Sequence, residues 1–408
     1  MPALAHPPLD DFTELYLRLA LQLERHIEGY VDAYFGPPQL KEQVLAEEKP
    51  SPKVLAKSTT QLRQQLDDAS YDDRRKDYLQ KQVHAMETVV NKLNGVKSPF
   101  LGEVEGYFDL KPDRPNEQAF LTALETLDDL FPGTGLLTER YESYRMQFEI
   151  PSDKQLQVLQ LAAAEVENRT KGTIIGSELP EYEELELTIV KDRPWSAFNW
   201  YLGQAKSKIE FNVDLPLSGL SVIDTMAHET YPGHHLEHAV KENLLYYQKG
   251  YGENSVLLTL APESLVSEGV ANYGRELIYT RREALEWAVD RIFPLLPRQP
   301  EINVEAEIEI SNALRAYDSL GGFLAFLLYV DGSSKEDCVK IALEHTPLTE
   351  ERIQAYLKFI LDPLWRSYIF NYYLGESLVE TYVERGDKVK RFQSLLQQQF
   401  WPSLLAQG

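Results

Sequence analysis

The sequence predicts a mainly α-helical fold with a small β-sheet, and three observations lead to that prediction. Apolar residues recur at helical spacing through most of the chain. The first such run is formed by Phe12, Leu15, Leu19, Leu23 and Ile27. Proline and glycine clusters divide the chain into segments of helical length. Strand-like alternation stands out in two short segments, residues 184–190 and 208–213.

The N-terminal part of the chain is predicted to form helices separated by helix-breaking sequences. We expect them over residues 10–35, 38–48, 53–95, 117–130, 136–147 and 153–170. Gly36, Pro37 and Pro38 end the first helix. Residues 96–118 contain five prolines and glycines, so we expect them to be irregular. This part is predicted to be a scaffold without chemistry of its own.

The middle and C-terminal parts combine the predicted strands with further helices. An aromatic-rich stretch, residues 194–203, lies between the two strands. A helix is expected to begin near residue 220 and to continue to about residue 247. The later helices are expected over residues 262–292, 300–330, 335–345, 350–361, 364–384 and 387–399. Residues 331–334 and Thr349 supply turn and capping signals.

Composition excludes several classes of protein. The net charge of −23 disfavours nucleic acid and anionic membrane surfaces as partners. No apolar run approaches the length of a membrane span, and the N-terminus lacks the basic and apolar regions of a signal peptide. The single cysteine, Cys338, excludes an intramolecular disulfide and suits a reducing compartment. We therefore expect a cytoplasmic protein.

Residues 227–235 form the stretch with the clearest chemistry. Four of the eight histidines lie within eleven residues: His228, His234, His235 and His238. In the pattern H-E-x-x-H, two histidines one helical turn apart bind zinc and the glutamate is the general base. Here a glutamate follows the first histidine, but Pro232 stands where the second is expected. The preceding apolar residues predict a buried helix, where histidines and a carboxylate need partners such as a metal ion.

The spacing leaves two candidates for the second histidine ligand. Six residues of straight helix turn by about 600° and rise by about 9 Å, which places His234 off the face of His228. Pro232 and Gly233 make a bulge or break plausible, which would return His234 to that face. Seven residues bring His235 back to about the same face, but about 10.5 Å along the axis. We prefer His234 and retain His235.

A catalytic zinc ion has three protein ligands and one open position, so a third ligand is needed. Glu268 lies among apolar and small neighbours in the helix predicted downstream. An unpaired carboxylate would be costly there. Glu276 is a weaker candidate, one helical face further on.

The motifs resemble a known family. His-Glu-x-x-Pro-Gly-His-His over residues 228–235 and Glu-Gly-x-Ala-x-Tyr over residues 268–273 are similar to the DUF885 family, which is grouped with the gluzincin-like metallopeptidases. The resemblance is weaker over residues 207–220 and near the C-terminus. It implies a gluzincin-like helical fold with a small sheet beside the zinc helix. Val270 stands where the family often has tryptophan, which leaves the shape of the substrate pocket open.

Carried over residue by residue, the resemblance implies Zn²⁺ as cofactor and a set of site residues. His228, Glu268 and one of His234 or His235 would be ligands, and Glu229 would be the base. Dipeptidyl peptidase III, a related zinc peptidase with the pattern H-E-x-x-G-H, favours His234, because Gly-His ends both motifs.

The resemblance also suggests roles outside the ligand set. Tyr372 and Gly375 match the Tyr-x-x-Gly element near the family's C-terminus, and Tyr372 is our candidate donor to the oxyanion of the attacked carbonyl. The resemblance implies that residues 208–213 form the edge strand that holds an extended substrate, and an ordinary amphipathic strand is the alternative interpretation. Arg275 and Arg366 are alternatives for binding a substrate carboxylate.

The function that we expect is a zinc metallopeptidase acting on a peptide or small amide. One alternative is a zinc hydrolase of a non-peptide amide or ester, because the same site serves both. Another is a non-catalytic metal-binding helical protein, in which His235 fills the fourth position of a closed site. We divide the chain into an N-terminal helical region, residues 1–175, and a zinc-site catalytic region, residues 176–408, within one integrated catalytic unit.

Overall fold

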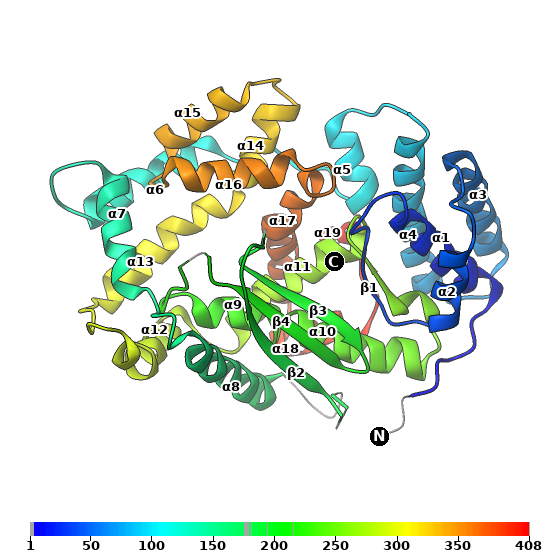
Figure 1. Ribbon diagram of the computed structural model, residues 1–408, viewed down its shortest axis with the longest axis horizontal. Coiled ribbons are helices and arrows are strands. Elements are labelled where there is room, and N and C mark those ends of the chain that lie inside the picture. Colours follow the sequence, from blue (N-terminus) through cyan, green and yellow to red (C-terminus); the bar gives the residue numbers. More distant parts are fainter. Residues whose placement is uncertain (1–3, 175–178, 181, 194, 215, 408) are drawn as a thin grey trace.

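The computed structural model describes residues 4–174, 179–180, 182–193, 195–214 and 216–407. Helices dominate, with two small sheets among them (Figure 1), which confirms the predicted mainly α-helical fold. The α-helices are α1 (Asp11–Glu24), α2 (Pro38–Ala46), α3 (Pro52–Asp68), α4 (Asp73–Leu93), α5 (Phe100–Phe108), α6 (Glu117–Leu130), α7 (Leu137–Arg145), α8 (Gln155–Thr173), α9 (Val222–Glu229), α10 (His234–Lys241), α11 (Pro262–Gly274), α12 (Arg281–Arg291), α13 (Val304–Leu314), α14 (Leu320–Tyr329), α15 (Lys335–His345), α16 (Glu350–Leu361), α17 (Trp365–Glu384), α18 (Lys388–Gln397) and α19 (Pro402–Gln407). The strands are β1 (Val31–Tyr34), β2 (Glu184–Val190), β3 (Ala197–Gly203), β4 (Lys206–Asn212) and β5 (Val256–Leu258). In these residues no helix is long and apolar enough to span a bilayer.

The three-stranded sheet has the order β2-β4-β3. β4 pairs in parallel with β2 and antiparallel with β3. The prediction that residues 208–213 form a substrate-binding edge strand is therefore wrong, because both sides of β4 are paired. The aromatic-rich stretch supplies the edge strand β3 instead, as the strand preference of aromatic residues would allow. β3 and β4 pack on α10, and β3 also contacts α9 (Figure 1).

The predicted helix over residues 10–35 ends at Glu24, and the chain then forms β1. Gly29 has a positive φ of 82°, which glycine adopts without strain. The Glu24 carboxylate accepts the amides of Gly29 at 3.1 Å and Val31 at 2.8 Å, so it stabilises the turn that replaces the last helical turns. β1 pairs antiparallel with β5, which lies more than 200 residues later in the chain. Local periodicity cannot reveal such a pairing.

Two further boundaries in the N-terminal part differ from the prediction. The helical run over residues 53–95 is two helices, because the Asp72 carboxylate caps a new helix by accepting the amide of Arg75 at 3.0 Å. Residues 96–118, expected to be irregular, contain α5, which begins directly after Pro99. Proline is tolerated at the start of a helix, so this proline does not interrupt the helix but precedes it.

The apolar side chains form two large cores that α11 and α17 join. One core draws on residues 12–141 and 256–370 and on Trp401, and the other draws on residues 148–296 and 379–405. Leu265 of α11 belongs to the first core, and Val266 and Val270 belong to the second. Each core combines side chains from before and after residue 175.

A pair of glycines lets α11 and α17 approach each other closely. A Cβ on Gly269 would lie 2.2 Å from the carbonyl oxygen of Gly375, and a Cβ on Gly375 would lie 2.4 Å from that of Leu265. Side chains at either position would push the helices apart. The close packing carries the tyrosines of α17 to the neighbourhood of Glu268 on α11.

Candidate metal centre

The helix that carries the histidine motif is interrupted directly after Glu229. α9 ends at that residue and α10 begins at His234. The amide of Gly233 donates to the carbonyl of Ala227 at 3.0 Å, six residues back rather than four. A Cβ on Gly233 would lie 1.9 Å from the carbonyl oxygen of His228, so this crossing requires glycine.

The interruption brings the first two histidines of the motif together. The ring centroids of His228 and His234 are 4.7 Å apart. Glu268 of α11 places Oε2 3.5 Å from Nε2 of His228 and Oε1 3.9 Å from Nε2 of His234. One ligand atom from each of the three residues lies within 4.8 Å of the others. The helix is thus interrupted at Pro232 and Gly233, as the sequence predicts.

The hydrogen bonds of His228 fix its tautomer. Asn272 donates through Nδ2 to the carbonyl of Tyr372 at 3.1 Å, which orients the amide so that Oδ1 faces His228. An amide oxygen only accepts, so Nδ1 of His228 carries the proton and donates at 2.9 Å. Nε2 therefore presents a lone pair toward Glu268, as a metal ligand requires.

A second chain of hydrogen bonds fixes His234 in the same way. Ser267 donates its only hydroxyl proton to the Glu237 carboxylate at 2.5 Å. Its oxygen can then only accept from Nδ1 of His234, 3.2 Å away. Both histidines therefore turn an unprotonated Nε2 toward the same carboxylate.

Burial sets the charge of each group in the cluster. Together with the Arg275 charge, it lowers the pKa of His228 to about 4. Burial and the neighbouring histidines hold the pKa of His234 well below its usual range. Burial, together with the Asp32 and Glu237 charges, raises the pKa of Glu268 to about 8. The histidines are therefore neutral at neutral pH, and the carboxylate lacks a cation.

These residues fit a divalent metal ion. Ligands about 2.1 Å from a tetrahedral zinc ion lie about 3.4 Å from each other, close to the 3.5 Å between His228 and Glu268. Oε2 of Glu268 is buried without a hydrogen-bond partner, which is costly unless a cation approaches it. The side chains of His228 and His234 remain 18% and 14% exposed, so one side of the cluster is open to solvent.

Glu229 lies beside the cluster with its carboxylate uncompensated. Its side chain has no hydrogen bond or ion pair to a described residue. Burial, together with the charges of Glu268 and Asp32, raises its pKa to about 8. Its carbonyl accepts from Nδ2 of Asn199 on β3 at 2.7 Å, which holds the end of α9 against the edge strand.

Two tyrosines of α17 approach the cluster. Tyr368 donates to Oε1 of Glu268 at 2.6 Å, and so orients the ligand carboxylate. Tyr372, the predicted oxyanion donor, is close enough to Glu229 and Glu268 that their charges, with burial as the larger cause, raise its pKa well above the usual range. Its hydroxyl has no hydrogen bond to a described residue.

His235 does not lie with the other two histidines. It is fully buried, and Nδ1 lies 2.8 Å from Ser207 of β4. Nε2 lies 2.8 Å from Oε1 of Glu183, which also accepts from Tyr231. Both ring nitrogens are thus engaged away from Glu268, and in the described part of the chain the group with metal-ligand geometry contains His234 in its place.

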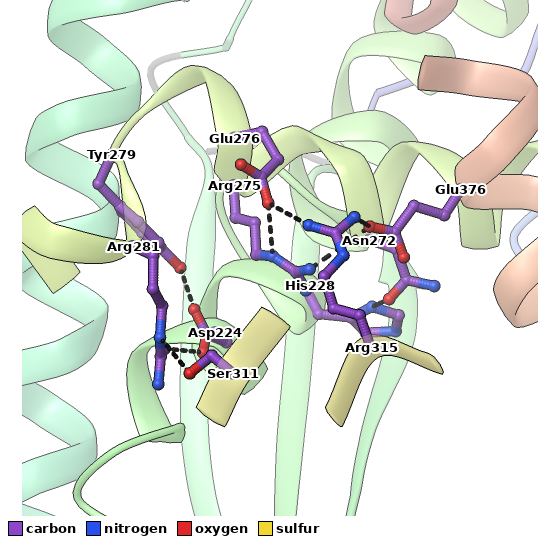
Figure 2. A network of polar contacts seen from close by, with 10 residues as sticks. All are labelled: Asp224, His228, Asn272, Arg275, Glu276, Tyr279, Arg281, Ser311, Arg315 and Glu376. Carbon is purple, nitrogen blue, oxygen red and sulfur yellow. Dashed lines mark hydrogen bonds and ion pairs between the residues drawn. The ribbon is translucent and has the colours of Figure 1, made fainter. Parts of the chain in front are cut away.

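The two arginines predicted to bind a substrate carboxylate form ion pairs with glutamates. Arg275 lies 3.5 Å from Glu276 and 3.4 Å from Glu376 (Figure 2). Glu276, the weaker ligand candidate, therefore pairs with arginine. Arg366 pairs with Glu103 in the first core. Figure 2 also shows Asp224, one turn before His228, held by Tyr279 and Arg281.

Sequence reasoning missed the residues that orient the ligands. Ser267 and Asn272 flank Glu268 within the same helix, and the Glu-Gly-x-Ala-x-Tyr pattern contains Asn272 at a variable position. Polar residues one turn from a candidate ligand on a buried face could have indicated this role. Asp32 carried no such signal, because it lies nearly 200 residues before the motif.

The comparisons with known proteins concern the fold. No family model matches this chain, and no curated protein matches it. A solved structure described as "the putative lipoprotein from Colwellia psychrerythraea" is similar, with a TM-score of 0.50 and 14% sequence identity. The match covers 90% of this chain and 68% of that chain. At this identity the likeness shows a related fold and carries no function.

Proposed function

We propose that the protein is a zinc-dependent metallopeptidase of the DUF885 type. His228, His234 and Glu268 hold the metal, and Glu229 is the general base. One observation carries the proposal: two histidines with free Nε2 lone pairs converge on a buried carboxylate, beside a second carboxylate that has no partner. A structural zinc site fills all four positions with protein ligands, whereas three converge here among the described residues.

Zinc at this cluster would act as a Lewis acid toward a substrate carbonyl and toward water. Glu229 then takes the proton of the attacking water and passes it to the nitrogen of the leaving amine. A base works best when its pKa lies near the operating pH, and burial raises the pKa of Glu229 to about 8 before a cation is bound.

Tyr372 suits the stabilisation of the developing negative charge. Its hydroxyl lies near Glu229 and Glu268 and has no other partner among the described residues. A phenol hydroxyl can donate to the carbonyl oxygen as that oxygen becomes negative. The Asn272 bond to the carbonyl of Tyr372 couples its position to that of His228.

The edge strand β3 suits an extended peptide substrate. β3 contacts α9, and Asn199 of β3 holds the carbonyl of Glu229. A peptide added to the free side of β3 by backbone hydrogen bonds would run past the end of α9. This feature favours a peptide over a small ester.

Metal analysis and peptide hydrolysis on the purified protein test the proposal. We expect about one zinc ion per chain and cleavage of members of a peptide library, read by mass spectrometry. Glu229→Gln should retain zinc and lose about 10²- to 10⁴-fold in turnover, because an amide cannot accept the proton. Near-native turnover by Glu229→Gln would exclude this mechanism. Cleavage of esters but of no peptide would favour the non-peptide hydrolase.

A further inference from the structure

Asp32 of β1 lies beside the candidate metal centre, although nothing in the motif refers to it. Its charge acts on Glu229 of α9, Glu268 of α11 and Tyr368 of α17. Groups on three elements distant in the sequence therefore lie within reach of the charge of this carboxylate. β1 also contacts the edge strand β3 (Figure 1).

The backbone around Asp32 is shaped to project its side chain. Val31 pairs with Leu258 and Ala33 pairs with Leu257, so Asp32 is the extra residue of a β-bulge. Bulges re-aim a side chain and occur often next to active sites. Hydrogen bonds hold the chain on either side, including the Val31 amide to Glu24 at 2.8 Å and the Thr259 amide to the carbonyl of Tyr30 at 2.9 Å.

The Asp32 carboxylate has no cation and no hydrogen-bond donor among the described residues. Burial alone raises its pKa to about 7. It is also absent from the group whose ligand atoms all lie within 4.8 Å of one another. Asp32 is therefore close to the candidate metal ligands without being one of them.

The charge balance of the loaded site indicates what Asp32 would bind. A divalent cation compensates the two carboxylates Glu229 and Glu268, while both histidines stay neutral. The negative charge of Asp32 then remains, in surroundings with low access to water. A single cationic group on the substrate would compensate it.

We propose that Asp32 binds the free α-ammonium group of the substrate, so that the enzyme removes residues from the N-terminus of peptides. This inference rests on the proposed function. The ammonium nitrogen of such a substrate lies about 2.5 Å from the carbonyl carbon of its first peptide bond. A carboxylate oxygen bound to it lies about 2.8 Å further on. Such a contact needs a carboxylate near the metal ligands but outside their set, and Asp32 meets both conditions.

The test compares matched peptides with free and acetylated N-termini, using the full-length, zinc-loaded protein. For the wild type we expect a kcat/KM roughly 10- to 100-fold higher for the free amine, from one charge-assisted contact to a partly buried carboxylate. Asp32→Asn should remove this preference by slowing the free peptide far more than the acetylated one, whose rate changes only through the weaker charge acting on Glu229. Glu28→Gln is the control, because it removes one exposed charge from the same turn.

Inhibitor binding provides a readout that does not depend on turnover. Leucine hydroxamate should bind the wild type roughly 10-fold or more tightly than N-acetyl-leucine hydroxamate, and Asp32→Asn should bind both alike. The thermal midpoint of Asp32→Asn should not fall, since the side chain has no internal partner to lose.

The outcomes separate this inference from the proposed function. Equal losses on free and acetylated peptides in Asp32→Asn would overturn amine recognition and leave the metallopeptidase intact. Equal cleavage of both peptides by the wild type, or cleavage only within the peptide interior, would do the same. A protein that binds no zinc and cleaves no peptide would overturn both.

Discussion

Two buried clusters of charged and polar side chains differ in how their charge is compensated. In one, Arg75 donates through Nε and Nη2 to Glu253 at 2.8 and 2.7 Å, and Gln399 donates to the same carboxylate at 2.9 Å. Tyr71 and Tyr251 cover the guanidinium with their rings. Every charge there has an opposite charge or a donor inside the protein.

The cluster at His228, His234 and Glu268 lacks that compensation. Its histidines are neutral, Oε2 of Glu268 has no donor, and the Glu229 carboxylate has no partner among the described residues. Burial of charge is common to both clusters, so it does not distinguish a site from a structural contact. Burial without compensation does, because such carboxylates keep their protons at neutral pH, as their raised pKa shows, until a cation replaces those protons.

The largest effect is expected from removing a ligand of the uncompensated cluster. His234→Ala should lower zinc affinity by more than about 100-fold and abolish hydrolysis. Even the loss of a residue that only hydrogen-bonds to a metal ligand lowers metal affinity by about 10- to 100-fold. His235→Ala is the matched control: zinc content should be retained, because both of its nitrogens bond elsewhere. Metal content after dialysis measures both. If His235→Ala lost zinc and His234→Ala retained it, His235 rather than His234 would be the metal ligand.

Breaking the compensated cluster should affect stability rather than metal binding. Arg75→Met leaves Glu253 buried without its cation, at a cost of about 3–5 kcal/mol in the free energy of unfolding. Arg63→Met removes the arginine of an exposed ion pair with Glu87 and should cost less than about 1 kcal/mol. Denaturant unfolding of both variants provides the measurement. A loss of zinc in Arg75→Met with unchanged stability would contradict the comparison.

Much of the fold followed from local patterns in the sequence. The helices over residues 335–345 and 350–361 begin and end as predicted, because Ser334 and Thr349 accept the amides that their first turns expose. The strand β1 did not follow, since its partner β5 lies far along the chain. β3 was not predicted, because its aromatic residues are equally compatible with a buried strand and a buried helix.

The part of the candidate site whose residues belong to short sequence motifs could be predicted. His228, Glu229 and Glu268 come from short motifs, and Pro232 and Gly233 indicated the break that positions His234. Asn272 and Ser267 act through hydrogen bonds whose direction depends on further partners, Tyr372 and Glu237. Asp32 reaches the site only through the pairing of β1, so no local pattern could identify it.

The residues that orient the ligands should have a smaller effect than the ligands. Asn272→Ala removes the acceptor that fixes the tautomer of His228 and should lower zinc affinity by about 10- to 100-fold. Asn371→Ala is the control, because this buried asparagine of α17 donates to Ser264 rather than to a ligand. Competition with a chelator measures the affinities. Equal zinc affinity in both variants would contradict the assigned tautomer.

The smallest effect is a dependence of zinc stabilisation on pH. Burial raises the pKa of Glu229 and of Glu268 to about 8 in the folded protein without metal. Their pKa in the unfolded chain is about 4.3. The folded state therefore holds protons that the unfolded chain has released, and the associated stability is lost as the pH rises through about 8.

Zinc binding should reverse this trend, because the cation replaces those protons. In the folded state His228 is unprotonated above pH 6, with a pKa of about 4, but histidine in the unfolded chain has a pKa of about 6.5, so the stability gained from His228 rises with pH up to about 7. The comparison therefore starts at about pH 7.5. The thermal midpoint without zinc should fall from about pH 7.5 to about pH 8.5, and the gain on adding zinc should grow over that range by up to about 1.4 kcal/mol per pH unit for each proton displaced. Glu229→Gln keeps the ligands but removes one of the two carboxylates, so the midpoint without zinc should fall less steeply. A zinc gain that shrinks with rising pH would mean that these carboxylates are already compensated, and the contrast between the two clusters would then fail.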